Sequence, residues 1–428
     1  MFFPAGNNAP TKTTSHKVVL PFYLYGALSL LTATIFILFS GNDFSGHYFN
    51  PHLLAITHMV ALGWGTMIIL GAGHQLVPVL IEGRLYSNAL AMASFTCGAA
   101  GIPLLVYGFY TFNMGWPARR GGELVFAAMV FYLLNMGMSI SRSKKENIHA
   151  LFVFTAVTWL MLTGLVGLTL VYNFTTQLLP ADSLHYLALH AHLGIVGWFL
   201  LMVMGVGSRL IPMFLISKYT DVKSLRLIYY LVNGALLFFT IQFLFSGPSE
   251  LAYFPLAAVL TAVFLFIRYI REAYKLRLRK KADDPLKLTL LSVAMIAIPV
   301  LMLLFLIGLT GLTGHAERIA LTYGFIIFFG WLTAIILGMT FKTLPFIVWN
   351  KVYHLRASSG PNPGPKDLFS DRVFRMMALF YMPGFLLFAG GIIFNAHNLL
   401  MAGAICLTAS AFLYNLNVFK IITHQPAK

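Results

Sequence analysis

The chain has 428 residues, of which 59% are hydrophobic and only 10% are charged. Because a soluble domain carries about 25% charged residues, this composition excludes a water-soluble globule and indicates an integral membrane protein. The net charge of +16 would suit a nucleic-acid partner, but its distribution along the chain predicts contact with a lipid bilayer and no nucleic acid.

Twelve apolar stretches are long enough to cross a bilayer as helices, which takes about 20 residues each. They are continuous rather than alternating, which argues against a transmembrane β-barrel. In chain order we expect membrane helices at residues 18–40, 52–80, 88–112, 122–141, 149–172, 186–215, 226–246, 251–274, 287–311, 319–348, 373–393 and 397–421. The predicted fold is an all-α polytopic membrane protein. Its single membrane domain, residues 18–421, lies between a first segment of residues 1–17 and a tail of residues 422–428.

Basic residues are unevenly divided between alternate connections. With the N-terminus in the cytoplasm, every Lys and Arg except Arg119, Arg120 and Arg318 falls on the inner side. This positive-inside bias predicts a multi-pass protein of the cell inner (plasma) membrane with both termini in the cytoplasm. The inner basic runs are expected to contact anionic lipid headgroups.

The second, sixth and tenth predicted helices share landmarks at equal spacings. Each carries a Gly-Trp pair, a glycine seven residues after the tryptophan and a proline 14 residues after it. The tryptophans, Trp64, Trp198 and Trp331, are 134 and 133 residues apart. We therefore predict three pseudo-repeats of four helices, at about residues 18–145, 146–285 and 286–421. Close helix packing alone would explain the glycines.

Histidines mark the outer ends of two of these helices. His58 and His192 each precede the tryptophan by six residues. An ionisable residue within a membrane span is costly and is a functional-site hypothesis by default, and neutral imidazole is a common ligand of haem iron, copper and zinc. We therefore expect metal binding at His58 and among His185, His190 and His192.

Whether those last three residues share one metal stays open. His185 and His192 are seven apart and lie on one helix face. His190 and His192 are two apart and point in different directions on a regular helix. They would reach the same ion only if the start of the helix is irregular.

An arginine pair lies in a predicted outer loop of residues 113–123, where positive charge is otherwise scarce. Guanidinium groups pair strongly with carboxylates, so Arg119 and Arg120 are candidates for binding the propionates of a haem. Contact with lipid phosphates is an equal alternative. Cys97 and Cys406 lie in separate apolar stretches, which excludes a disulfide scaffold and a CxxCH haem attachment.

Twelve helices in three groups of four, with inner termini and histidines at the outer ends of helices two and six, resemble subunit I of the haem-copper oxidases. The NnrS family of haem- and copper-containing membrane proteins is similar too. The resemblance implies haem b at His58 and copper at His192, with His190 beside it. The seventh helix has no histidine and Phe325 stands where the tenth would carry one, so a complete dinuclear centre is not expected. Water, a methionine or His315 would then be the second haem ligand.

The expected function is that of an integral membrane haem and/or copper-binding protein that handles electrons or a small gas, O2 or NO. If it catalyses a reaction, it is an oxidoreductase supplied by a quinol or cytochrome donor, and other membrane subunits are candidate partners. Two alternatives stay open. One is a membrane transporter or channel for a metal or small solute, with the outer histidines as its loading site. The other is a non-catalytic structural or assembly subunit.

Overall fold

The computed structural model describes residues 14–143, 147–309, 316–353 and 363–425. Over these residues the chain is helical and forms no strand. Twelve of its helices are long and apolar enough to cross a membrane, which confirms the predicted all-α polytopic fold. Most of the predicted first segment, the last residues of the tail and His315 lie outside the described residues.

The helices agree with the predicted ranges to within a few residues, except at the fourth. Their bounds are α1 His16–Phe39, α2 Pro51–His58, α3 Met67–Leu80, α4 Asn88–Tyr110, α5 Trp116–Ser141, α6 Ile148–Thr176, α7 Leu187–His192, α8 Leu201–Leu215, α9 Val222–Leu244, α10 Tyr253–Lys275, α11 Asp284–Met295, α12 Ala297–Leu309, α13 Ala316–Phe325, α14 Thr333–Tyr353, α15 Asp371–Phe394 and α16 His397–Ile422.

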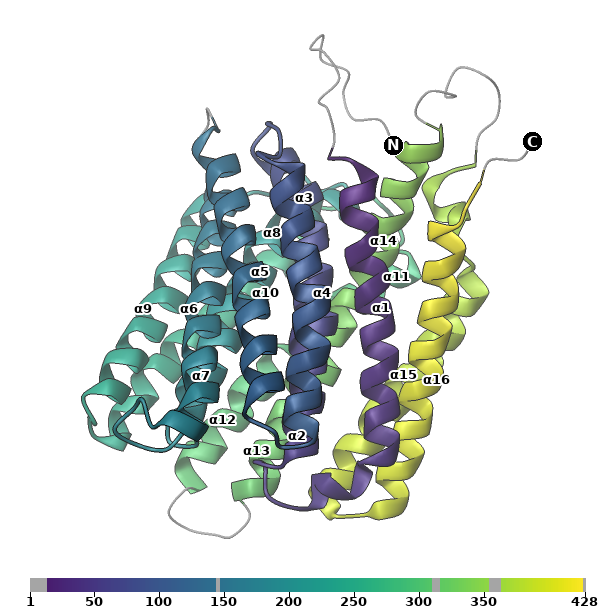
Figure 1. The fold of residues 1–428 in the computed structure, drawn as a ribbon. Coiled ribbons are helices and arrows are strands. Elements are labelled where there is room, and N and C mark those ends of the chain that lie inside the picture. The colour runs from purple at the N-terminus through teal and green to yellow at the C-terminus, as the bar shows by residue number, and fades with distance from the viewer. Residues whose placement is uncertain (1–13, 144–146, 310–315, 354–362, 426–428) are drawn as a thin grey trace.

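The helices run roughly along one common axis (Figure 1). The start of α1 and the end of α16 lie at the same end of the bundle, as an even number of spans requires. The helices α2, α7 and α13 begin at the opposite end. The molecule is therefore a multi-pass membrane protein in which α2 and α7, which carry His58 and His190, begin at the end of the bundle opposite to the start of α1 and the end of α16.

The fourth span begins earlier than predicted. Residues 113–123 were expected to form an outer loop, but α5 starts at Trp116 and includes both Arg119 and Arg120. Pro117 occupies its first turn, where the missing N–H has no intrahelical partner to lose and the fixed φ suits a helix. The loop assignment for the arginine pair is therefore wrong.

The three spans with shared landmarks contain the same irregularity. Between α2 and α3 the chain forms the π-helical segment η2, Met59–Thr66. The segments η3, Leu193–Leu200, and η5, Ile326–Leu332, occupy the same place in the sixth and tenth spans. Each contains the Gly-Trp pair. These spans are also more deeply buried than the other nine, so they form the centre of the bundle.

The three tryptophans link these segments in a cycle that is broken at one point. Trp64 Nε1 donates to Thr333 Oγ1 at 3.2 Å, and Trp198 Nε1 donates to Thr66 Oγ1 at 3.0 Å. Each acceptor stands two residues after a tryptophan of another repeat. The third bond would run from Trp331 to residue 200, which is a leucine. Trp331 Nε1 is accordingly buried without a hydrogen-bond partner in the described part of the chain.

The second glycine of each landmark set allows a close helix crossing. A Cβ atom on Gly71 would collide with Phe22 of α1, one on Gly205 with Phe152 of α6, and one on Gly338 with Thr289 of α11. In each repeat, the marked span thus packs closely against the span that precedes it. This is the packing role that small residues have in membrane bundles.

Candidate functional site

His58 is the last residue of α2, directly before the π-helical segment η2. Its Nδ1 lies 2.8 Å from the carbonyl oxygen of Leu54. A carbonyl oxygen can only accept, so Nδ1 carries the proton and Nε2 of the neutral ring keeps a free lone pair. The Phe109 ring of α4 packs against the imidazole at a centre distance of 4.7 Å. An imidazole fixed in this way by a backbone carbonyl is the usual form of a histidine that binds a metal.

His190 approaches the same place from α7. It lies against α6 at Gly167, where a Cβ atom would be only 2.7 Å from the His190 Cε1 atom. Its Nδ1 atom is buried and has no hydrogen-bond partner among the described residues. The backbone of Thr163 on α6 is the polar group that acts on this ring, so the ring is held against α6 and away from bulk water.

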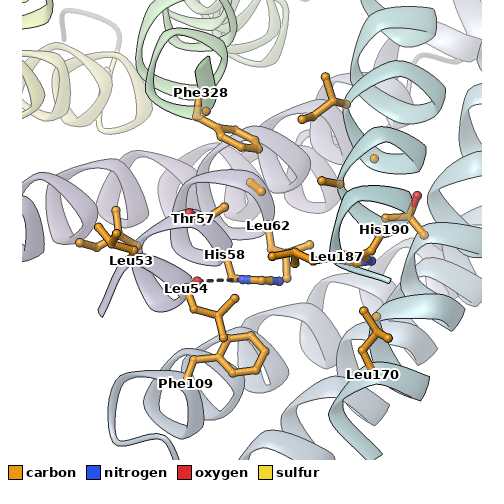
Figure 2. Close-up of a pocket in the computed structure, with 18 of the residues that line it drawn as sticks. Leu53, Leu54, Thr57, His58, Leu62, Phe109, Leu170, Leu187, His190 and Phe328 are labelled. Carbon is orange, nitrogen blue, oxygen red and sulfur yellow. Dashed lines mark hydrogen bonds between the residues drawn. The ribbon is translucent and has the colours of Figure 1, made fainter. Parts of the chain in front are cut away.

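The two imidazoles lie close together and nearly parallel. Their ring centres are 6.2 Å apart and their planes differ by 14°. In Figure 2 the His58 ring extends from α2 toward the helix that carries His190, and the dashed line marks its bond to Leu54. The structure therefore brings together one histidine from the first repeat and one from the second.

Both histidines line a cavity of about 350 Å³. Binding pockets for small organic ligands have volumes of about 300–1,000 Å³. The walls come from α2, α4, α5, α6, α7 and α13 and from the three π-helical segments, and they are mainly apolar. None of the described residues that line it is Asp, Glu, Lys or Arg.

The hydroxyl groups on the cavity wall are largely committed to other partners. Thr163 Oγ1 donates to the Trp159 carbonyl at 2.7 Å, and Ser183 Oγ donates to the Leu170 carbonyl at 3.0 Å. Thr66 accepts from an indole. The imidazole nitrogens are therefore the strongest ligand atoms that the cavity wall offers.

His192 occupies the position in its repeat that His58 occupies in the first, yet it does not line this cavity. Its Nδ1–H donates to the Ala188 carbonyl at 2.8 Å, which repeats the geometry of His58. Its Nε2 lies 3.4 Å from the hydroxyl of Tyr323, and its ring packs against Phe239 of α9. His192 thus faces a space that aromatic side chains fill.

Phe325, the equivalent residue of the third repeat, is packed in the same manner. Its ring lies within 6 Å, centre to centre, of Phe329, Phe385 and Phe388. Phe325 also lines the cavity, so of the three equivalent positions only that of His58 brings a metal-binding side chain to it.

The histidines of the sixth span do not gather around one point. Helix α7 is regular from Leu187 to His192, so the side chains of His190 and His192 diverge as expected for residues two apart. His185 is exposed before the helix and contacts Tyr186 and Phe243. Across the described residues, no three His, Cys, Asp or Glu side chains are placed to hold one metal. The option of a shared site for His185, His190 and His192 is not realised in this geometry.

The arginine pair lies one turn beyond the cavity wall, which α5 joins at Gly122. Arg120 Nη1 forms an ion pair with Glu123 at 2.7 Å. Arg119 donates to the hydroxyl groups of Thr175 and Thr176 at the end of α6. Binding of carboxylates by the two arginines stays a prediction, and it would require an exchange of these partners.

Two parts of this site are not apparent from the sequence. Gly167 carries no motif, and only the packing of α6 against α7 reveals its contact with His190. His190 was identified as a ligand, but as a partner of His192 rather than of His58. No protein-family model matches the chain, so the resemblance to the haem-copper oxidases rests on the landmarks of the three central spans.

Proposed function

We propose that this protein binds a haem b, or a copper ion, between its first two repeats and uses it to carry electrons or to bind O2 or NO. The observation that supports this most is the His58 imidazole, whose Nδ1–H is held by Leu54 while Nε2 faces an apolar cavity. In this proposal the cavity lies in the outer half of the plasma membrane, as the positive-inside bias predicts.

Three features of the chain have separate roles in this proposal. His58 Nε2 would be the metal ligand, and the Leu54 carbonyl fixes the tautomer and the direction of the ring. The apolar wall excludes water and keeps charged groups away from the metal. Haem iron or copper, when bound, supplies the change of oxidation state and the affinity for a diatomic gas.

The fold and the donor set together favour a relative of the haem-copper oxidases without their dinuclear centre. Within the described residues there is no cluster of three ligands for a separate copper. We therefore propose electron transfer or gas binding at one metal centre. The donor would be a quinol or a cytochrome, and other membrane subunits are candidate partners.

The test is a visible spectrum and a metal analysis of protein purified in detergent after expression with ample haem and copper. We expect a Soret band or about one copper per chain, lost in His58→Ala. The control is His397→Ala, which removes an exposed histidine at the start of α16 and should change nothing. Wild-type protein that stays colourless and metal-free would refute the proposal. Flux of a metal or solute into proteoliposomes would then favour the transporter alternative.

A further inference from the structure

We infer that His58 and His190 would both be ligands of one metal, one from each of the first two repeats. The inference rests on the proposed function and assigns the second ligand. It replaces water, methionine or His315 in that role with a residue from the second repeat.

The spacing of the rings fits this arrangement. A metal–imidazole bond is about 2.0–2.1 Å long, so two such bonds placed end to end set the ring centres about 6 Å apart. The observed separation is 6.2 Å, with the ring planes within 14° of parallel. The distance between the ring centres therefore matches the one that two ligands of a shared metal would have.

Both rings are also held in place by groups outside the cavity. The Leu54 carbonyl holds His58, and the missing side chain of Gly167 lets His190 lie directly against α6. Metal ligands that are oriented by such surroundings lose typically 10–100-fold in metal affinity when the surroundings are mutated.

The charge of the cavity limits which metal centres fit. No described wall residue carries a charge, and an uncompensated charge inside a membrane protein is costly. Two neutral imidazoles suit either ferrous haem, whose porphyrin dianion cancels the iron charge, or Cu(I), which carries a single charge and takes soft or imidazole ligands. In both alternatives, haem and Cu(I), two imidazoles would hold the metal.

Two imidazole ligands would favour electron transfer over gas binding at this site. A haem iron with two imidazoles has no open position, so a gas binds only when His190 leaves. On a Cu(I) ion, the two imidazoles would likewise occupy two coordination positions.

The experiment compares the wild type with His190→Gln and His190→Gly after loading with haem in one arm and with Cu(I) in the other. In the haem arm we expect a low-spin electron paramagnetic resonance spectrum of the oxidised wild type. His190→Gln and His190→Gly should keep the haem but become high-spin and bind carbon monoxide. Added imidazole should restore the low-spin spectrum of His190→Gly. In the copper arm, about one Cu(I) per chain should be retained and lost in both variants.

His192→Ala is the matched control, because His192 has the same backbone bond but lies outside the cavity. Its metal content and spectrum should equal those of the wild type. If the wild type binds haem through His58 but is high-spin, or if His190→Gln leaves the spectrum unchanged, the inference is wrong while the proposed function stands. If neither haem nor copper binds the wild type, both are wrong.

Discussion

The substitution Gly167→Ala should disturb the metal centre although both histidine side chains stay in the protein. The Cβ of an alanine there would lie 2.7 Å from His190 Cε1, 3.3 Å from Nδ1 and 3.5 Å from Nε2. Ordinary contact begins near 3.4 Å, so the ring or the α6 backbone must shift by about 0.7 Å. Metal–ligand distances are kept within about 0.2 Å. Gly167→Ala should therefore weaken or break the bond to His190, with a loss of about 10–100-fold in metal affinity.

The assay is the rate of haem or copper transfer from Gly167→Ala to an external acceptor, together with the fraction of high-spin iron. Gly234→Ala on α9 is the matched control, since a Cβ there meets no atom within 4 Å. It should leave both quantities unchanged, and it should not weaken the helix, because alanine is favoured over glycine in helices by about 0.5–1 kcal/mol. Equal transfer rates and spin states for Gly167→Ala and the wild type would refute the assignment of His190 as a ligand.

Three further predictions concern stability. Trp331→Phe removes a donor without a partner, whereas Trp64→Phe breaks a hydrogen bond. Trp64→Phe should therefore cost about 1–2 kcal/mol more stability, measured as the thermal half-life in detergent. An equal cost for the two substitutions would contradict the broken cycle. Burial raises the pKa of Asp283, but its ion pairs with Lys342 at 2.6 Å and with Arg279 outweigh this and leave the pKa below its usual value. A carboxyl group whose pKa is lowered by folding stabilises the protein above its unfolded pKa of about 3.9, and this stabilisation is lost as the pH falls through the folded pKa. Asp283→Asn should therefore shorten the half-life at pH 7 and match the wild type in acid. A constant difference in half-life across this pH range would refute the linkage. Finally, haem or Cu(I) at 100 times its dissociation constant should stabilise the protein by about 2.7 kcal/mol, and this gain should vanish in His58→Ala.

The membrane helices could be predicted because apolar length is a local property of the chain. Continuous runs of about 20 apolar residues leave few other folds, and the spacing of Trp64, Trp198 and Trp331 identified the three central spans. The start of α5 was missed because its first turns contain Arg119 and Arg120. Their charge lowers the hydropathy of the stretch, although Pro117 favours a helix start there.

The pairing of the site residues could not be predicted in the same way. The repeat alignment placed His58 and His192 together, since they match in position. Side-chain direction depends on the helices that surround each residue, and these differ between repeats: Phe239 and Tyr323 fill the space that His192 faces. His190 lies near His58 because α7 packs against α6 at Gly167. This contact joins two different spans, so the sequence of either span alone does not reveal it.

One metal between the imidazoles of His58 and His190 is the feature on which the proposed function and its second ligand both depend. The most direct test is a high-resolution cryo-electron microscopy map of the purified full-length protein, with metal content measured on the same sample. We expect density for a haem or a single ion between the two rings, with one nitrogen of each imidazole about 2.0–2.1 Å from the metal. A cavity that contains only water or a lipid tail, with metal absent from the sample, would contradict it.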